Sequence, residues 1–89
     1  KWGMLYKDYL QKYNPVLFST LLTQGKLYQH CAEIDTQAQQ MFNTLVEQMT
    51  KTENITEQLK SQNQLEWVRR MNSIQERASE IVCKGLIYV

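Results

Sequence analysis

The chain contains 89 residues, a length that suits one domain, and we expect a single helical domain over residues 1–89. Its composition, 43% hydrophobic and 21% charged, is too apolar for a disordered segment and too polar for a membrane protein. The net charge of +1 and the two cysteines exclude a strongly charged tail and a disulfide-based scaffold.

The first 25 residues predict two short helices. Apolar side chains recur at spacings of three and four in the first of them: Trp2, Leu5, Tyr6, Tyr9, Leu10 and Tyr13. Asn14 and Pro15 are typical of the N-cap and first position of a second helix, and Gly25 is typical of its end. The apolar residues of the second helix lie most of the way round it: Val16, Leu17, Phe18, Leu21 and Leu22. We therefore expect this helix at the centre of the fold.

A long helix without a breaker is predicted from Lys26 to about Thr50. Its apolar residues keep spacings of four and three: Leu27, Cys31, Ile34, Ala38, Met41 and Leu45. A polar turn is expected over residues 51–54, and one or two helical turns over residues 55–60.

A second long helix is expected to begin after Asn63 and to stop at Gly85. Asn63 and Glu66 together have the form of a capping box. The apolar tail, Leu86–Val89, either packs back on the helices or meets a partner. The predicted fold class is all-α: two short helices followed by a long antiparallel helical hairpin, a small helical bundle.

Side chains with catalytic or metal-binding chemistry are scattered along the sequence. His30 is the only histidine, and apart from Glu33 no further ligand has the spacing that a helical metal site needs. We therefore expect no enzyme, no metal, no cofactor and no small-molecule substrate. Cys31 is predicted to pack in the core and Cys83 to be a free thiol on the polar surface, without a disulfide between them.

The cationic residues of the last helix are candidates for binding nucleic acid. All arginines of the chain lie there, and Arg70 and Arg77 share a face because they are seven residues apart. The candidate phosphate contacts are Arg69, Arg70, Arg77 and Lys84. The alternative interpretation is a solvated helix face with intrahelical ion pairs such as Glu66 with Arg70.

A helix-turn-helix over Leu17–Ile34 is a further alternative, since a helix, Gly25 and a helix follow one another there. The bulky Leu21, four residues before the glycine, opposes close packing of the two helices. The second helix also turns acidic at Glu33, which weighs against a DNA-reading role.

The last helix carries a pattern that resembles a known family. It runs from Gln64 to Ile74 as Q-L-E-W-V-R-R-M-N-S-I and continues at Arg77-Ala78, Glu80-Ile81-Val82 and Leu86-Ile87-Tyr88. Earlier matches are Lys1-Trp2-Gly3, Tyr9-Leu10, Gly25-Lys26-Leu27, Gln37-Ala38 and the segment Thr56–Lys60. Together they resemble the TnpV family, small proteins encoded on bacterial transposons, over nearly the whole chain.

The resemblance implies a cytoplasmic bacterial accessory protein of a mobile element. Family members usually carry further residues before the Lys-Trp-Gly pattern, so we expect the chain to be the C-terminal part of a slightly longer protein. One implied role is that of an excisionase-like DNA-binding factor, whose partners would be transposon-end DNA and an element-encoded recombinase. The four cationic candidates would then contact phosphates.

The alternative is a non-enzymatic helical protein-interaction or dimerisation module. Its contact residues would be apolar: Trp67, Leu86, Ile87 and Tyr88. This interpretation predicts a homodimer or a protein partner, and neither interpretation involves a membrane.

Overall fold

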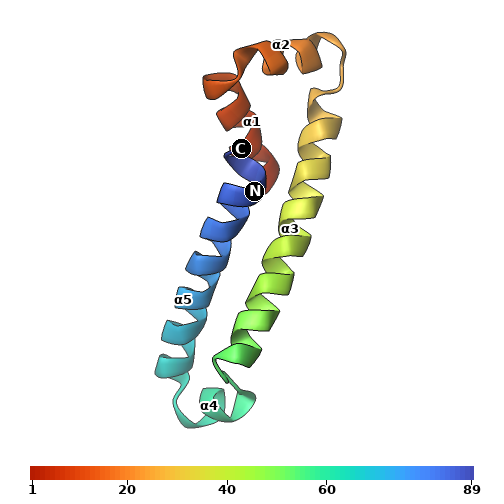
Figure 1. Cartoon of the computed structure of the whole chain (residues 1–89). Coiled ribbons are helices and arrows are strands. Elements are labelled where there is room, and N and C mark those ends of the chain that lie inside the picture. Colours follow the sequence, from red (N-terminus) through yellow and green to blue (C-terminus); the bar gives the residue numbers. More distant parts are fainter.

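The computed structural model describes all of residues 1–89 and contains helices but no strand. In chain order the elements are α1 (Trp2–Tyr13), α2 (Pro15–Thr23), α3 (Leu27–Thr52), α4 (Glu57–Gln62), α5 (Gln64–Val82) and the π-helical turn η1 (Cys83–Ile87). Figure 1 shows α3 and α5 side by side and antiparallel, with α4 at the turn between them and α1 and α2 at the opposite end. The molecule is a rod of 55 × 19 × 18 Å, and the predicted all-α fold with a long helical hairpin is confirmed. None of the helices is both long and apolar enough to cross a lipid bilayer.

Local signals place the ends of α2 where the sequence predicts them. Asn14 Oδ1 accepts a hydrogen bond from the Leu17 N–H at the start of the helix. Gly25, with a φ of +71°, closes the helix, and the Lys26 N–H donates to the Leu21 carbonyl oxygen. Glycine adopts this left-handed conformation without steric cost.

Asparagine residues also stand at the ends of the hairpin helices, but the predicted capping box is incomplete. Asn54 takes the left-handed position after α3, and the buried Ile55 donates its N–H to the Thr50 carbonyl oxygen. Asn63 caps α5 by accepting a hydrogen bond from the Glu66 N–H. The return bond of the predicted capping box is not formed, because the Glu66 carboxylate pairs with arginines of its own helix.

The main core lies where α1, α3 and the end of α5 meet, rather than along the whole rod. Eight buried side chains form it: Trp2, Tyr6, Leu10, Leu27, Cys31, Ala38, Val82 and Ile87. Full burial of one large apolar side chain contributes about 1.5–3 kcal/mol, so this end supplies much of the stability.

The expectation that α2 lies at the centre of the fold is wrong. None of its side chains is buried, and only Phe18 and Leu21 are half-buried against the core. α2 instead crosses the end of the rod as a connection between α1 and α3 (Figure 1). Side chains of α1, α3, α5 and η1 already fill the interior, so the other faces of α2 stay exposed.

The prediction that the last helix stops at Gly85 is wrong. After Val82 the helix passes into η1, in which the Tyr88 N–H donates to the Cys83 carbonyl oxygen at 2.7 Å. This wider turn carries the chain through Gly85 and places Ile87 in the core, with none of its surface exposed. Burial of Ile87 outweighs the tendency of glycine to end a helix. The tail therefore packs back on the helices.

Candidate interaction site

α1 is held on one stripe of α3. The Gly3 N–H donates to Asp35 Oδ1 at 2.9 Å, and the Trp2 ring N–H donates to Gln39 Oε1 at 3.1 Å. The Trp2 ring also lies against Phe42, with 5.5 Å between the ring centroids. Asp35, Gln39 and Phe42 are spaced by four and three residues, so they share one face of α3.

The same stripe of α3 continues past the start of α1. Val46 and Met49 keep the spacing of four and three from Phe42, and both are half-buried. α1 runs antiparallel to α3 and begins at Trp2, beside Phe42, so α1 does not cover them. These two side chains extend the surface that holds α1 and stay partly exposed.

A stripe of uncharged residues on α5 lies on the same side of the hairpin, because Asn72, Gln75 and Ser79 line one pocket together with Phe42. It recurs at spacings of three and four: Leu65, Val68, Asn72, Gln75 and Ser79. Leu65 is 71% exposed and Val68 is 39% exposed, although both side chains are apolar. We call these five residues, together with Val46 and Met49, the α3/α5 strip.

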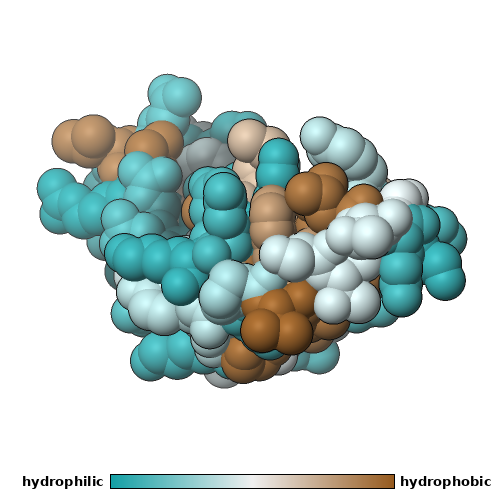
Figure 2. All heavy atoms as spheres, turned by 90° about the horizontal axis from the view of Figure 1, so that it is seen from above, coloured by the Kyte–Doolittle hydropathy of each residue, from teal (hydrophilic) through white to brown (hydrophobic).

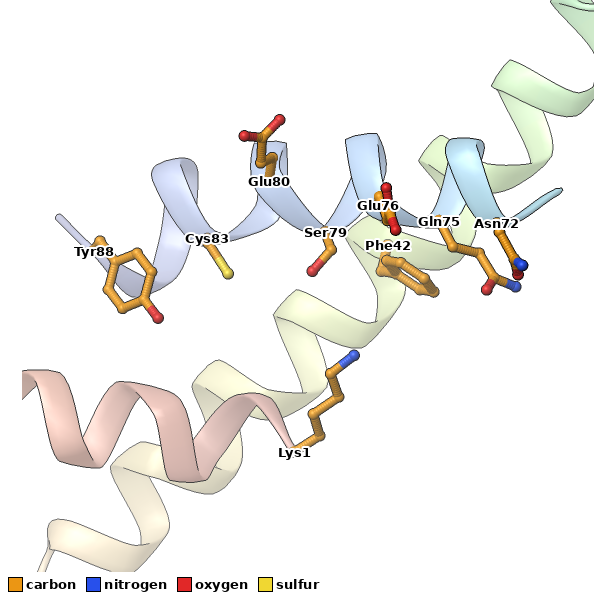
Figure 3. Close-up of a pocket in the computed structure, with 9 residues that line it drawn as sticks. All are labelled: Lys1, Phe42, Asn72, Gln75, Glu76, Ser79, Glu80, Cys83 and Tyr88. Atoms are coloured by element: carbon orange, nitrogen blue, oxygen red, sulfur yellow. The ribbon is translucent and has the colours of Figure 1, made fainter. Parts of the chain in front are cut away.

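An open pocket of about 560 Å³ lies at the end of the α3/α5 strip where α1 begins. Its lining residues come from α3, α5 and the two ends of the chain: Lys1, Phe42, Asn72, Gln75, Glu76, Ser79, Glu80, Cys83 and Tyr88. Figure 3 shows the Lys1 side chain extending toward Phe42, and its Nζ lies 5.9 Å from the Phe42 ring centroid. Glu76 and Glu80 border the strip with negative charge, whereas the strip itself is uncharged.

The candidate phosphate-binding residues all lie on α5 or η1, but three of them pair with carboxylates. The Glu66 carboxylate accepts a hydrogen bond from Arg70 Nε at 2.9 Å, which is the pair that the sequence suggested. It also forms an ion pair with Arg69 at 3.5 Å. Arg77 pairs at 2.8 Å with Glu53, at the end of α3. Sequence spacing did not reveal this last pair because its members are 24 residues apart. Lys84 forms no ion pair.

The candidate interaction residues differ in how far they reach the surface. Trp67 is half-buried, with Lys60 Nζ 4.8 Å from its ring centroid. Leu86 packs against the core and Ile87 is fully buried. Tyr88 remains exposed and lies against Tyr9, with 5.4 Å between the ring centroids. Tyr88, 48% exposed, is the most accessible of the four residues.

The chemically reactive side chains form a packed cluster beneath α1. Tyr6 Oη and His30 Nε2 share a hydrogen bond of 3.0 Å. Burial raises the pKa of the Tyr6 hydroxyl, and the neighbouring Cys31 adds to this. Burial also raises the pKa of the Cys31 thiol, partly offset by the Lys7 ammonium, so the thiol stays protonated and weakly nucleophilic at neutral pH.

The second cysteine lies elsewhere than expected. Cys83 is half-buried against the core and lines the open pocket, rather than standing on the polar surface. Its position follows from η1, which begins at this residue and turns the chain toward the core.

The α3/α5 strip was not among the sites predicted from the sequence. The helix lengths could have indicated the strip, because the apolar spacing of α3 runs over 26 residues whereas α1 has only 12. A helix of that length cannot cover the whole stripe, since each residue adds only about 1.5 Å.

Comparison with known proteins places the chain in a family. A family model described as transposon-encoded protein TnpV matches residues 1–87, which is nearly the whole chain. No curated protein and no solved structure matches it. The match agrees with the resemblance seen in the Gln64–Ile74 pattern and at the earlier positions. The chain therefore belongs to the TnpV family of transposon-encoded proteins.

Proposed function

We propose that this transposon-encoded protein is a non-enzymatic dimerisation module, in which the α3/α5 strip packs against the same strip of a second copy. One observation supports this most: the stripe of α3 that holds α1 continues beyond α1 over Val46 and Met49, which stay partly exposed. A helix from another chain that lies in line with α1 would bury both side chains, together with Leu65 and Val68.

The accessible surface area is consistent with a further contact. The chain exposes 6269 Å² at a mass of 10.6 kDa, whereas a compact monomer of that mass exposes about 5,500 Å². The difference, roughly 800 Å², equals the area that each partner contributes to a standard protein interface.

The charges beside the strip favour antiparallel α5 helices in the dimer. Arg69 and Glu76 are seven residues apart and flank the strip on the same side. With the two-fold axis beside Asn72, Arg69 of each copy faces Glu76 of the other. In a parallel arrangement the two Arg69 side chains would lie on opposite sides of the interface, and neither would face Glu76 of the other copy.

Cysteine cross-linking tests this geometry. Asn72→Cys, in a Cys83→Ser background, places a thiol beside the proposed two-fold axis. We expect mild oxidation to link two chains efficiently, because the two thiols face each other. Arg70→Cys in the same background is the matched control, since its exposed side chain lies on the opposite face of α5. Equal cross-linking of both variants, or none in Asn72→Cys, would contradict the proposed interface.

A second candidate function is DNA binding. It is favoured by a row of cationic residues on another face of α5 and η1. Arg70, Arg77 and Lys84 follow one another at intervals of seven residues, and Lys84 has no carboxylate partner. The ion pairs of the two arginines are exposed. Such pairs contribute about 0–1 kcal/mol, so phosphates can displace the carboxylates. The strip and the row are separate, so a dimer would leave the row accessible.

Fluorescence anisotropy with a labelled transposon-end duplex and a scrambled duplex tests this second function. Replacing Arg70, Arg77 and Lys84 by alanine should weaken binding and lower the slope of log affinity against log salt by about three. Lys12→Ala with Lys26→Ala is a control that removes two cations at the α2 end of the rod. Absence of binding by the wild-type chain at low salt would exclude the DNA-binding role.

A further inference from the structure

α2 presents an uncharged apolar surface at one end of the rod. No residue between Lys12 and Lys26 is charged. Val16 is 77% exposed and Leu22 is 54% exposed. Figure 2 looks down on this end and shows hydrophobic residues at the surface among hydrophilic ones. These side chains lie outside the α3/α5 strip, so this surface is independent of the proposed dimer interface.

Lysine and tyrosine residues bracket α2 on both sides. Lys12 and Tyr13 precede the helix, and Lys26 and Tyr28 follow it. Both tyrosines are exposed, and each has a lysine Nζ near its ring: Lys12 lies 5.3 Å from the Tyr13 centroid and Lys7 lies 5.4 Å from the Tyr28 centroid. None of these three lysines forms an ion pair. No carboxylate therefore lies within ion-pair distance of these lysines.

We propose that the α2 end docks on an anionic lipid surface. Val16 and Leu22 would enter the boundary between headgroups and acyl chains, and the lysines would lie against lipid phosphates. Tyrosine and lysine suit this boundary, because each combines an apolar body with a polar end. Docking of this kind requires no membrane-spanning helix.

Two other occupants fit the α2 end less well. A DNA duplex would neutralise the lysines but would leave Val16 and Leu22 without an apolar surface to contact. A second copy would bury those side chains, but it would bring Lys12 and Lys26 against the same lysines of its partner. Residues 13–25 contain no carboxylate that could compensate this repulsion.

Vesicle co-sedimentation of the full chain tests the proposal. We expect binding to phosphatidylcholine vesicles that contain phosphatidylglycerol, and little binding to phosphatidylcholine alone. Val16→Ser with Leu22→Ser should weaken binding about tenfold through lost apolar contact, without unfolding the chain, because neither residue is buried. Lys12→Gln and Lys26→Gln should each weaken it about fivefold.

Matched controls change the same chemistry elsewhere on the rod. Ile81→Ser removes another exposed apolar side chain, and Lys51→Gln with Lys60→Gln removes two charges at the hairpin turn. These variants should bind as the wild type does. The proposal is overturned if the wild type does not bind anionic vesicles at low salt, or if the controls lose as much binding as the α2 variants. It is also overturned if the Val16→Ser, Leu22→Ser variant loses self-association or duplex binding while keeping vesicle binding.

Discussion

Gly3 lies where the backbones of α1 and α3 come close together. A Cβ atom at this position would lie 3.0 Å from the Cys31 carbonyl oxygen and 3.4 Å from Asp35 Cβ. Backbone cannot move aside as a flexible side chain can, so the helices would have to separate. The absence of a side chain at residue 3 thus allows the Trp2 and Tyr6 rings to reach the core.

Gly3→Ala should therefore destabilise the protein, although alanine favours a helix. We expect the free energy of unfolding to fall by about 1–2 kcal/mol, after about 1 kcal/mol of gained helix propensity. Gly85→Ala is the matched control, because its Cβ would meet only Met41 Cε at an ordinary 3.7 Å. Thermal unfolding of both variants measures the difference in their stability. A Gly3→Ala protein as stable as Gly85→Ala would show that the helices are not in close contact.

Asp35 links the stability of the α1 start to pH. The Gly3 N–H bond lowers the pKa of the Asp35 carboxyl. Its stabilising effect is therefore fully present above the unfolded pKa of about 3.9 and is lost as pH falls through the lower folded value.

Asp35→Asn should lower stability at neutral pH by less than about 1 kcal/mol, because the side chain is partly exposed and its charge is screened. Chemical denaturation at a series of pH values measures the effect. The difference from the wild type should shrink as pH falls below about 3.9. A difference that stays constant down to the most acidic pH would refute the role of the charge.

At the scale of the elements, η1 turns the chain so that its end becomes part of the core. Ile87→Ala should lower the free energy of unfolding by about 2–5 kcal/mol, because the side chain is completely buried. That is a large part of the 4–13 kcal/mol or so expected for a chain of this length. Val89→Ala, at a residue that is 72% exposed, should change it by less than about 0.5 kcal/mol. Equal effects in urea denaturation would mean that the tail is not packed.

Helix ends were predictable from sequence because their causes are local. Asn14, Gly25 and Asn63 each act on backbone groups within five residues, so type and position suffice. The exposure of α2 and the passage of the chain through Gly85 depend on what other elements fill the core. The residue pattern of one segment does not show which other segments fill the core.

At the scale of the whole molecule, the fold is a rod with its main core at one end. The radius of gyration is 16.8 Å, whereas a compact domain of this length has about 12 Å. The arginines of the last helix could be named from the sequence, but their pairing could not, since Glu53 reaches Arg77 only through the hairpin. The α3/α5 strip likewise exists only because α1 is short and lies over one part of α3.

The central claim is that two copies pair through the α3/α5 strip with antiparallel α5 helices. Sedimentation equilibrium of the wild type, of Arg69→Glu, of Glu76→Arg and of the double variant measures it most directly. We predict a species of twice the 10.6 kDa chain mass that persists at high salt. Each single variant should weaken association on the order of tenfold by turning two attractions into repulsions, and the double variant should restore it. A wild type that stays monomeric at every concentration, or a double variant as weak as the single ones, would contradict the account.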